Sequence, residues 1–206
     1  SPIASSPICI PKSPDIMKRM QSVFDVRVNP KALLSPSALN CYLDCPLKFY
    51  YKYVAGLAAP EEVSAEIDSA KFGSIFHYAA EHIYKELTAH GKVINKDTLE
   101  ALLQEEVKLQ NYVDNGFKEL FFHLPADERP EYNGVQLINS AVILRYIQQL
   151  LHNDLRHAPF TFVGSEQRVM EDVEIQTPKG VIRSRMGGII DRMDSKDNVL
   201  RIVDYK

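Results

Sequence analysis

The sequence predicts an α+β protein in which helices come first and strands follow. From about residue 71 to 156, apolar residues recur every three or four positions, which is the period of amphipathic helices. After Pro159 the pattern changes to alternating apolar and polar residues, which is typical of half-buried strands. A length of 206 residues is sufficient for one large domain with a substantial core.

The N-terminal part of the chain predicts short, interrupted elements. Residues 1–32 are expected to be an irregular lead-in or linker, because prolines and serines break every period there. A helix should begin where the Ser35 hydroxyl can cap a first turn that contains Pro36. Cys45-Pro46 should break and restart it, and Gly56 should end the second piece. We expect an acidic loop over residues 58–69.

Three longer helices and three strands are predicted further along. The helices are expected over Lys71–Leu87, Lys96–Val113 and residues 134–156. In the last helix the expected buried stripe consists of Leu137, Ala141, Leu144, Ile147 and Leu151. The strands are expected to begin at Phe160, to cover Val181–Met186 on the way to Asp191, and to cover Val199–Lys206.

The last two strands carry the residues that are most informative about function. Asp197-Asn198 suits a two-residue hairpin loop, because both residue types tolerate positive φ. Lys196 would then face Val199, and Asp191 would face Asp204 with Cβ atoms about 5 Å apart on one side of the sheet. A loop one residue longer would instead move Asp191 off that side.

Asp191, Asp204 and Lys206 would therefore converge on one patch, while Tyr205 points to the other side of its strand. Two carboxylates this close repel each other unless a proton or a cation lies between them. Carboxylates, water and a substrate phosphate form a typical Mg²⁺ environment, beside which a lysine can orient or deprotonate the attacking water. The alternative is an ordinary solvated hairpin, since Asp and Lys are common on exposed turns.

Several segments together resemble a known family. Gly188–Arg192, followed by Val203–Lys206, resembles the core motif of the PD-(D/E)XK nuclease superfamily, and in particular its RecB and AddB exonuclease branch. Gly73–His77 resembles the helix motif of that branch. Leu34–Ser37 and Cys45–Tyr50 resemble its N-terminal segment. The motifs occur in the expected order.

The resemblance covers residues 33–206, which would form the nuclease domain. It implies a restriction-endonuclease-like α/β fold with a central mixed sheet flanked by helices and an N-terminal helical portion. It also implies exonucleolytic, Mg²⁺- or Mn²⁺-dependent hydrolysis of DNA phosphodiester bonds. Carried over residue by residue, the metal ligands would be His77, Asp191, Asp204 and the backbone carbonyl of Tyr205. The catalytic residues would be Lys206, Asp204 and Asp191, and Glu166 resembles an additional acidic position in some members.

The chain departs from the family pattern at three places. Ile190 precedes the first metal aspartate instead of proline, as is common in the RecB branch. Some relatives hold an iron–sulfur cluster, and Cys45 matches its first cysteine. No cysteine follows Cys45, so this chain cannot complete that cluster, and we expect reduced thiols. The family continues past the catalytic motif, so we expect a natural domain longer than one that ends at Lys206.

Charge and hydropathy limit the expected partners. A formal net charge of −3 does not favour coating of a polyanion, so DNA contact requires a local basic face. The candidates for that face are Lys48, Lys52, Arg183, Arg185 and Arg192. No apolar run approaches the roughly 18 residues of a membrane span, and no secretory signal is recognisable. We therefore expect a cytoplasmic protein with no membrane contact.

The resemblance implies DNA as substrate and a helicase subunit or adjoining helicase domain as partner, in DNA repair and recombination. The alternative is a catalytically inactive module of the same fold, which would bind DNA or act as a scaffold in a larger repair complex. Retention of both aspartates and of the lysine favours the active form.

Overall fold

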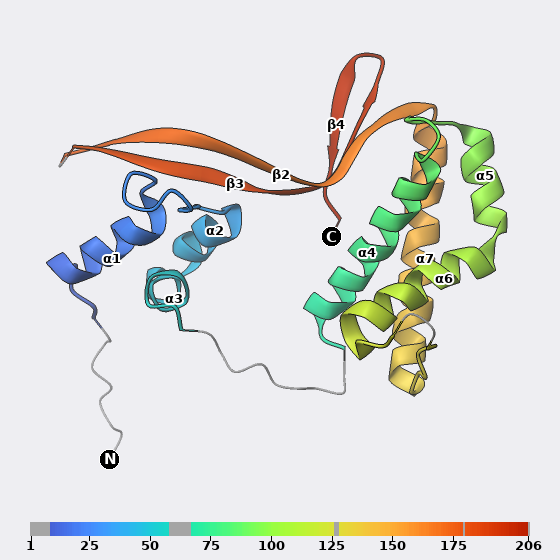
Figure 1. Ribbon diagram of the computed structural model, residues 1–206, viewed down its shortest axis with the longest axis horizontal. Helices are drawn as coiled ribbons and strands as arrows, with labels where there is room; N and C mark the ends of the chain where they lie inside the picture. The colour runs from blue at the N-terminus through green and yellow to red at the C-terminus, as the bar shows by residue number, and fades with distance from the viewer. Residues whose placement is uncertain (1–8, 58–66, 126–127, 179, 206) are drawn as a thin grey trace. The chain divides into compact units, whose positions relative to one another are not determined.

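A computed structural model describes residues 9–57, 67–125, 128–178 and 180–205 (Figure 1). In chain order the elements are α1 (Pro14–Phe24), α2 (Pro36–Asp44), α3 (Pro46–Phe49), a π-helical turn (Tyr50–Val54), α4 (Ser69–Leu87), β1 (Val93–Ile94), α5 (Lys96–Gln104), α6 (Glu106–Phe117), a second π-helical turn (Lys118–Phe122), α7 (Gly134–His157), β2 (Phe160–Thr177), β3 (Gly180–Lys196) and β4 (Val199–Val203). The α+β class is thus confirmed.

The chain divides into two compact units. The first unit comprises Ser1–Glu61 and Arg168–Ile189, and the second comprises Glu62–Gln167 and Ile190–Lys206. Strands β2 and β3 each contribute residues to both units.

The first unit begins with a helix that the sequence analysis did not predict. Helix α1 follows Ser13, whose side chain accepts a hydrogen bond from the backbone N–H of Ile16 at 3.4 Å. Pro14 occupies the first turn, where its missing N–H has no partner to lose. The prediction of an irregular lead-in is therefore wrong for Pro14–Phe24, because a proline in a first turn starts a helix as readily as it breaks one.

The next two helices of this unit agree with the prediction. Ser35 caps α2 by accepting from the N–H of Ala38 at 3.1 Å, and Cys45 ends it. The chain restarts at Pro46 as α3, and Gly56 adopts a positive φ of 67° shortly after the π-helical turn. The predicted acidic loop falls mostly on residues 58–66, which lie outside the described part of the chain.

The second unit has a helical core in which α4, α5, α6 and α7 pack against one another (Figure 1). Strand residues Ile94, Phe160 and Phe162 join the same core. The predicted helix over Lys96–Val113 is in fact two helices, because Glu105 leaves helical geometry with ψ of 62°. Among the described residues, no helix is long and apolar enough to cross a membrane.

The buried stripe of α7 differs from its prediction. Ile147 and Leu151 are buried as expected, but Leu137 is 59% exposed. The stripe instead continues through polar side chains, namely Gln136, Ser140 and Asp154. Hydropathy alone misplaced the first half of the stripe, because these polar groups find hydrogen-bond partners inside the unit.

The strands form a sheet in the order β1-β2-β3-β4, and β1–β2 and β3–β4 pair antiparallel. The β3–β4 register confirms the predicted hairpin, with Lys196 opposite Val199 and Arg192 opposite Val203. Asp197 and Asn198 have φ of 51° and 61°, as a two-residue loop of this kind requires. An isolated parallel bridge joins Leu34 to Met186 within the first unit.

Candidate metal centre

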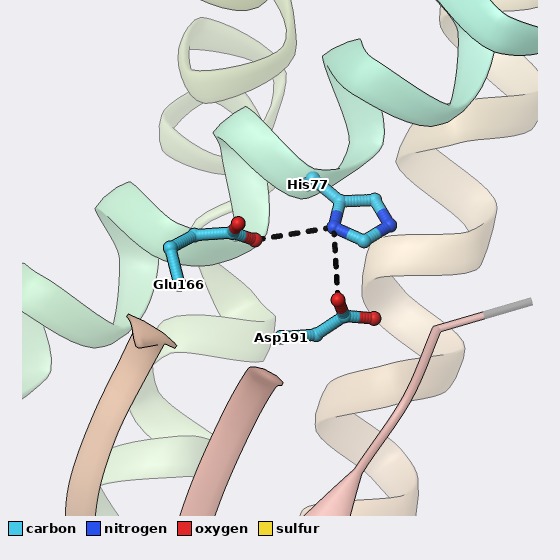
Figure 2. A group of neighbouring side chains, drawn as sticks. All are labelled: His77, Glu166 and Asp191. Atoms are coloured by element: carbon cyan, nitrogen blue, oxygen red, sulfur yellow. Dashed lines mark hydrogen bonds and ion pairs between the residues drawn. The ribbon is translucent and has the colours of Figure 1, made fainter. Parts of the chain in front are cut away.

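Three side chains from different elements of the second unit converge on one point. They are His77 of α4, Glu166 of β2 and Asp191 of β3 (Figure 2). The Nδ1 atom of His77 lies 3.2 Å from Oε1 of Glu166 and 3.8 Å from Oδ1 of Asp191. All three donor atoms lie within 4.8 Å of one another.

Helix α4 places His77 at the edge of the core. Asp68 caps this helix by accepting from the N–H of Lys71 at 2.7 Å. Ile75, Ala79 and Ile83 form its buried face, so that His77 lies on the flank of that face and is partly exposed. A histidine in this position can reach a solvent-accessible ligand while its helix stays anchored in the core.

Glu166 reaches the group through an unusual backbone conformation. Its φ is 48°, in the left-handed region that a non-glycine residue enters at a cost of about 1–2 kcal/mol. A Cβ added at Gly164, two residues earlier, would lie 2.0 Å from Nε2 of the exposed Gln167 side chain, which would have to move. The strand is therefore irregular at Glu166, and strained residues of this kind are concentrated at functional sites.

Asp191 is held by the chain end that follows the hairpin. The backbone N–H of Tyr205 donates to Oδ2 of Asp191 at 2.6 Å, while Oδ1 is the oxygen nearer to His77. The Tyr205 ring packs edge-on against Phe76 and His77, with centroids 5.3 and 5.4 Å away. Burial raises the pKa of Tyr205 above its usual value.

The donor set fits a divalent cation. Ligands about 2.1 Å from an octahedral Mg²⁺ lie about 3 Å apart at adjacent positions, close to the spacing of the His77 and Glu166 donors. Two carboxylates and one imidazole carry more negative than positive charge. In the described part of the chain, the ion pairs of Glu166 and Asp191 are those with His77. A cation would relieve the repulsion between the carboxylates.

An open groove of about 650 Å³ runs beside this group along α4. Its lining includes Ser69, Gly73, Ser74, Tyr78, Glu81, His77 and Glu166. A Cβ added at Gly73 would meet no heavy atom within 4 Å, so this stretch of the groove is open. The groove therefore gives an extended ligand access to the three donor atoms.

The other predicted residues of the centre, Asp204, Lys206 and the Tyr205 carbonyl, remain predictions. Asp204 is exposed and is not a member of the group whose donor atoms lie within 4.8 Å of one another. Lys206 lies outside the described residues. For Tyr205, the contacts of the N–H and of the ring are defined, and its carbonyl remains a predicted ligand.

One of the predicted basic-face residues is misplaced. Arg192 is only 1% exposed, because its guanidinium is enclosed by the core and bound to Asp154. It cannot reach a phosphate, so the prediction that it contacts DNA is wrong. In the first unit, Arg183 pairs with Glu174, and Arg185 pairs with Asp172.

The remaining candidates also lie in the first unit. Lys48 is exposed, and its Nζ lies 3.7 Å from Oδ2 of Asp44. The ammonium of Lys52 lies over the ring of Tyr53. Both amines are available to solvent, and their contact with DNA stays a prediction. Cys45 is a free thiol whose sulfur accepts from the N–H of Lys48 at 3.4 Å, which gives it a local capping role.

Sequence reasoning missed the acidic partners of Arg192. Asp154 is buried on α7 and Asp194 is buried on β3, two residues beyond Arg192. A signal for Asp154 was present, because it follows Ile147 and Leu151 at helical spacing and so falls in the buried stripe. A carboxylate in that position requires a buried cation or donor.

Comparison with known proteins agrees with this geometry. Residues 33–206 match the family model of the PD-(D/E)XK nuclease superfamily. The chain is also 27% identical over 186 residues to an ATP-dependent helicase/deoxyribonuclease subunit of Carboxydothermus hydrogenoformans. That alignment covers 86% of this chain and 16% of the relative, so the chain spans a small part of the relative's length. The chain therefore belongs to the PD-(D/E)XK nuclease superfamily, and it resembles the RecB and AddB branch.

Proposed function

We propose that this chain is a metal-dependent deoxyribonuclease domain that hydrolyses DNA phosphodiester bonds exonucleolytically. The observation that carries the proposal is the convergence of His77, Glu166 and Asp191 in a chain that belongs to a nuclease superfamily. Mg²⁺ or Mn²⁺ is the expected ion, since carboxylate oxygens such as those of Glu166 and Asp191 suit both. The chemistry supplied by such an ion is charge stabilisation on phosphate and activation of water.

The protein residues have separable tasks in this proposal. His77, Glu166 and Asp191 hold the ion, and the Tyr205 N–H keeps one Asp191 oxygen in place. Asp204, the Tyr205 carbonyl and Lys206 remain the predicted additional ligands and the catalytic acid–base residue of the family motif. The groove along α4 would admit the DNA strand, with Gly73 permitting close approach of its backbone.

The similarity to a helicase/deoxyribonuclease relative supports a helicase subunit or adjoining helicase domain as the partner in DNA repair and recombination. Lys48, Lys52, Arg183 and Arg185 remain candidates for phosphate contacts, without Arg192. Because the chain matches a small fraction of that relative, these partners are proposals for the complete protein. The cytoplasmic location likewise stays a prediction.

The test is degradation of linear DNA by the 206-residue chain with Mg²⁺, with Mn²⁺ and with EDTA. We expect cleavage with either ion and none with EDTA. Asp191→Ala should reduce the rate about 100-fold or more, since it removes a ligand of the ion. Glu171→Ala, which removes an exposed carboxylate of β2, is the matched control and should keep wild-type activity. Cleavage that persists in EDTA would contradict the proposal, and DNA binding without cleavage would favour the inactive-module alternative.

A further inference from the structure

A buried ionic network lies next to the candidate metal centre, and its residues differ from the three donor residues His77, Glu166 and Asp191. It joins side chains from four elements of the second unit, namely Tyr84 of α4, Asp154 of α7, Arg192 and Asp194 of β3, and Arg201 of β4. Arg192, Asp154 and Asp194 are each at most 1% exposed. Two arginines face two aspartates, so the network is neutral as a whole.

Asp154 of α7 binds both Arg192 of the β3–β4 hairpin and Tyr84 of α4. Its Oδ2 accepts from Nη1 of Arg192 at 2.6 Å, and its Oδ1 accepts from Nη2 of Arg192 at 2.8 Å. The Tyr84 hydroxyl donates to the same carboxylate. Burial raises the pKa of Tyr84 well above its usual value, which agrees with a protonated hydroxyl that donates. Bidentate pairs of this kind constrain orientation as well as distance.

Asp194 and Arg201 extend the constraint across the hairpin. Arg201 donates through Nε and Nη2 to the two oxygens of Asp194 at 2.8 and 2.7 Å. It also reaches Oδ1 of Asp154 at 3.2 Å. The guanidinium of Arg192 lies over the Tyr84 ring, 4.4 Å from its centroid. Strands β3 and β4 are thereby attached to α7 and α4 through a single set of charges.

Replacing all the charges of such a network together with hydrophobic residues of similar volume is often neutral or stabilising, because burying charges costs desolvation. In some proteins the role of a buried polar or ionic group is to select one register and one orientation. Here Arg192 directly follows Asp191 in β3, and Tyr84 lies two turns after His77 in α4. The network thus connects the two segments that carry two of the three donor atoms.

We infer that Asp154, Arg192 and Asp194 are positioning residues that hold the Asp191 carboxylate at the distance from His77 that a metal ion requires. The predicted effect on metal affinity rests on the proposed function, since positioning of Asp191 affects affinity only if the group binds an ion. The position of the Asp191 carboxylate can also be tested without metal, through its hydrogen bond from the Tyr205 N–H. Exchange of that amide should become faster if the carboxylate moves away.

The test uses the 206-residue chain and the variant Asp154→Asn, which removes one charge at nearly constant shape. Amide hydrogen exchange of Tyr205 is measured by NMR relative to the amide of Ile83 in α4, and Mn²⁺ affinity is measured from the free-ion EPR signal. We expect Tyr205 to exchange about tenfold faster and the dissociation constant of Mn²⁺ to rise about tenfold, as for other residues that orient a metal ligand. Unchanged values of both would overturn the inference.

Leu109→Ala is the matched control, because Leu109 is fully buried in the same core on α6. It should lower the unfolding midpoint without changing Mn²⁺ affinity or the relative exchange of Tyr205. Equal effects in this control would show general destabilisation and would also overturn the inference. Should Asp154→Asn not fold, Arg201→Gln changes a partly exposed member of the network, and the same two measurements decide. A wild-type chain that binds no Mn²⁺ would contradict the proposed function, while Tyr205 exchange would still test the positioning.

Discussion

Two clusters of carboxylates in the second unit contain adjacent residues of β3, Asp191 and Arg192, but they differ in burial and in net charge. The group of His77, Glu166 and Asp191 is partly exposed and carries an excess of negative charge. The network around Arg192 and Asp154 is buried, and its charges balance. In the first arrangement negative charge exceeds positive charge, whereas in the second two arginines balance two aspartates.

The difference shows how a strand can serve both purposes. Alternate residues of a strand point to opposite sides, so Asp191 and Arg192 belong to different environments although they are neighbours in the chain. Buried carboxylates require compensating charge from the protein, because water cannot solvate them. The side chains of Glu166 and Asp191 keep 32% and 12% of their surface exposed, so water partly screens the repulsion between them. The degree of burial therefore distinguishes the Arg192–Asp154 network, which maintains the structure, from the group of His77, Glu166 and Asp191, which is suited to a ligand.

The largest expected effect is on stability, from breaking the balanced network. Arg192→Met leaves Asp154 and Asp194 with Arg201 as their remaining arginine, and should lower the free energy of unfolding by about 3–5 kcal/mol. The matched control is Arg183→Met, also on β3, which removes an exposed pair with Glu174 and should cost at most about 1 kcal/mol. Urea denaturation followed by circular dichroism measures both. Equal losses would show that burial does not distinguish the two arginines.

The second prediction concerns the unbalanced group. Mn²⁺ at about 100 times its dissociation constant should raise the free energy of unfolding of the wild-type chain by about 2.7 kcal/mol. In Asp191→Asn this gain should be largely lost. Without metal, the same variant should be no less stable than wild type, because the repulsion from Glu166 is relieved. Thermal unfolding with and without Mn²⁺ is the measurement, and a large loss of stability in the metal-free variant would contradict the comparison.

A third, smaller effect tests the backbone strain at Glu166. Its φ of 48° suits glycine, so Glu166→Gly should be more stable than Glu166→Ala by about 1 kcal/mol in the absence of metal. Both variants should bind Mn²⁺ more weakly than wild type, since each lacks the carboxylate. Chemical denaturation of the two variants side by side measures the difference. A glycine variant that is the less stable of the two would argue against strain at this residue.

The smallest effect concerns pH at the edge of the buried network. Burial lowers the pKa of His157, and the charges of Arg201 and Lys196 act in the same direction against Asp194. The unfolded chain, in which histidine titrates near about pH 6.5, therefore binds more protons than the folded chain just below that pH. The contribution of the neutral His157 to the free energy of unfolding is therefore complete above about pH 6.5 and is lost as the pH falls below it.

The corresponding measurement is the unfolding midpoint on either side of the histidine pKa, at about pH 7.5 and about pH 5.5. His157→Gln should make the fall between these pH values smaller. His152→Gln, which changes an exposed histidine of the same helix, is the control and should leave the fall unchanged. A fall that is the same in all three proteins would exclude His157 as its source.

Much of the local structure was predictable, because its determinants are close together in the sequence. The Ser35 cap, the break at Cys45 and the hairpin at Asp197-Asn198 each depend on a few adjacent residues. Helix α1 was missed because a proline at its first turn was interpreted as a breaker. The division between α5 and α6 was missed because the apolar pattern continues across Glu105.

The candidate site shows the same limit. His77 and Asp191 were singled out by motif, and the hairpin register followed from turn chemistry. The proximity of Glu166 to His77 depends on a positive φ in β2 and on a separation of 89 residues, which no local pattern encodes. The role of Arg192 was mistaken because an arginine beside a catalytic-type aspartate is equally suited to binding phosphate or to entering a buried network.

The sequence by itself determined the class of fold, the hairpin and the family, since these depend on periodicity, turn residues and ordered motifs. Only the tertiary structure decided which charges are buried. A carboxylate without access to water needs a cationic side chain beside it, whereas one with access to water can remain unpaired until an ion binds. That access is set by the packing of distant elements. On those grounds Asp154 and Asp194 belong to the framework, and Asp191 belongs to the site.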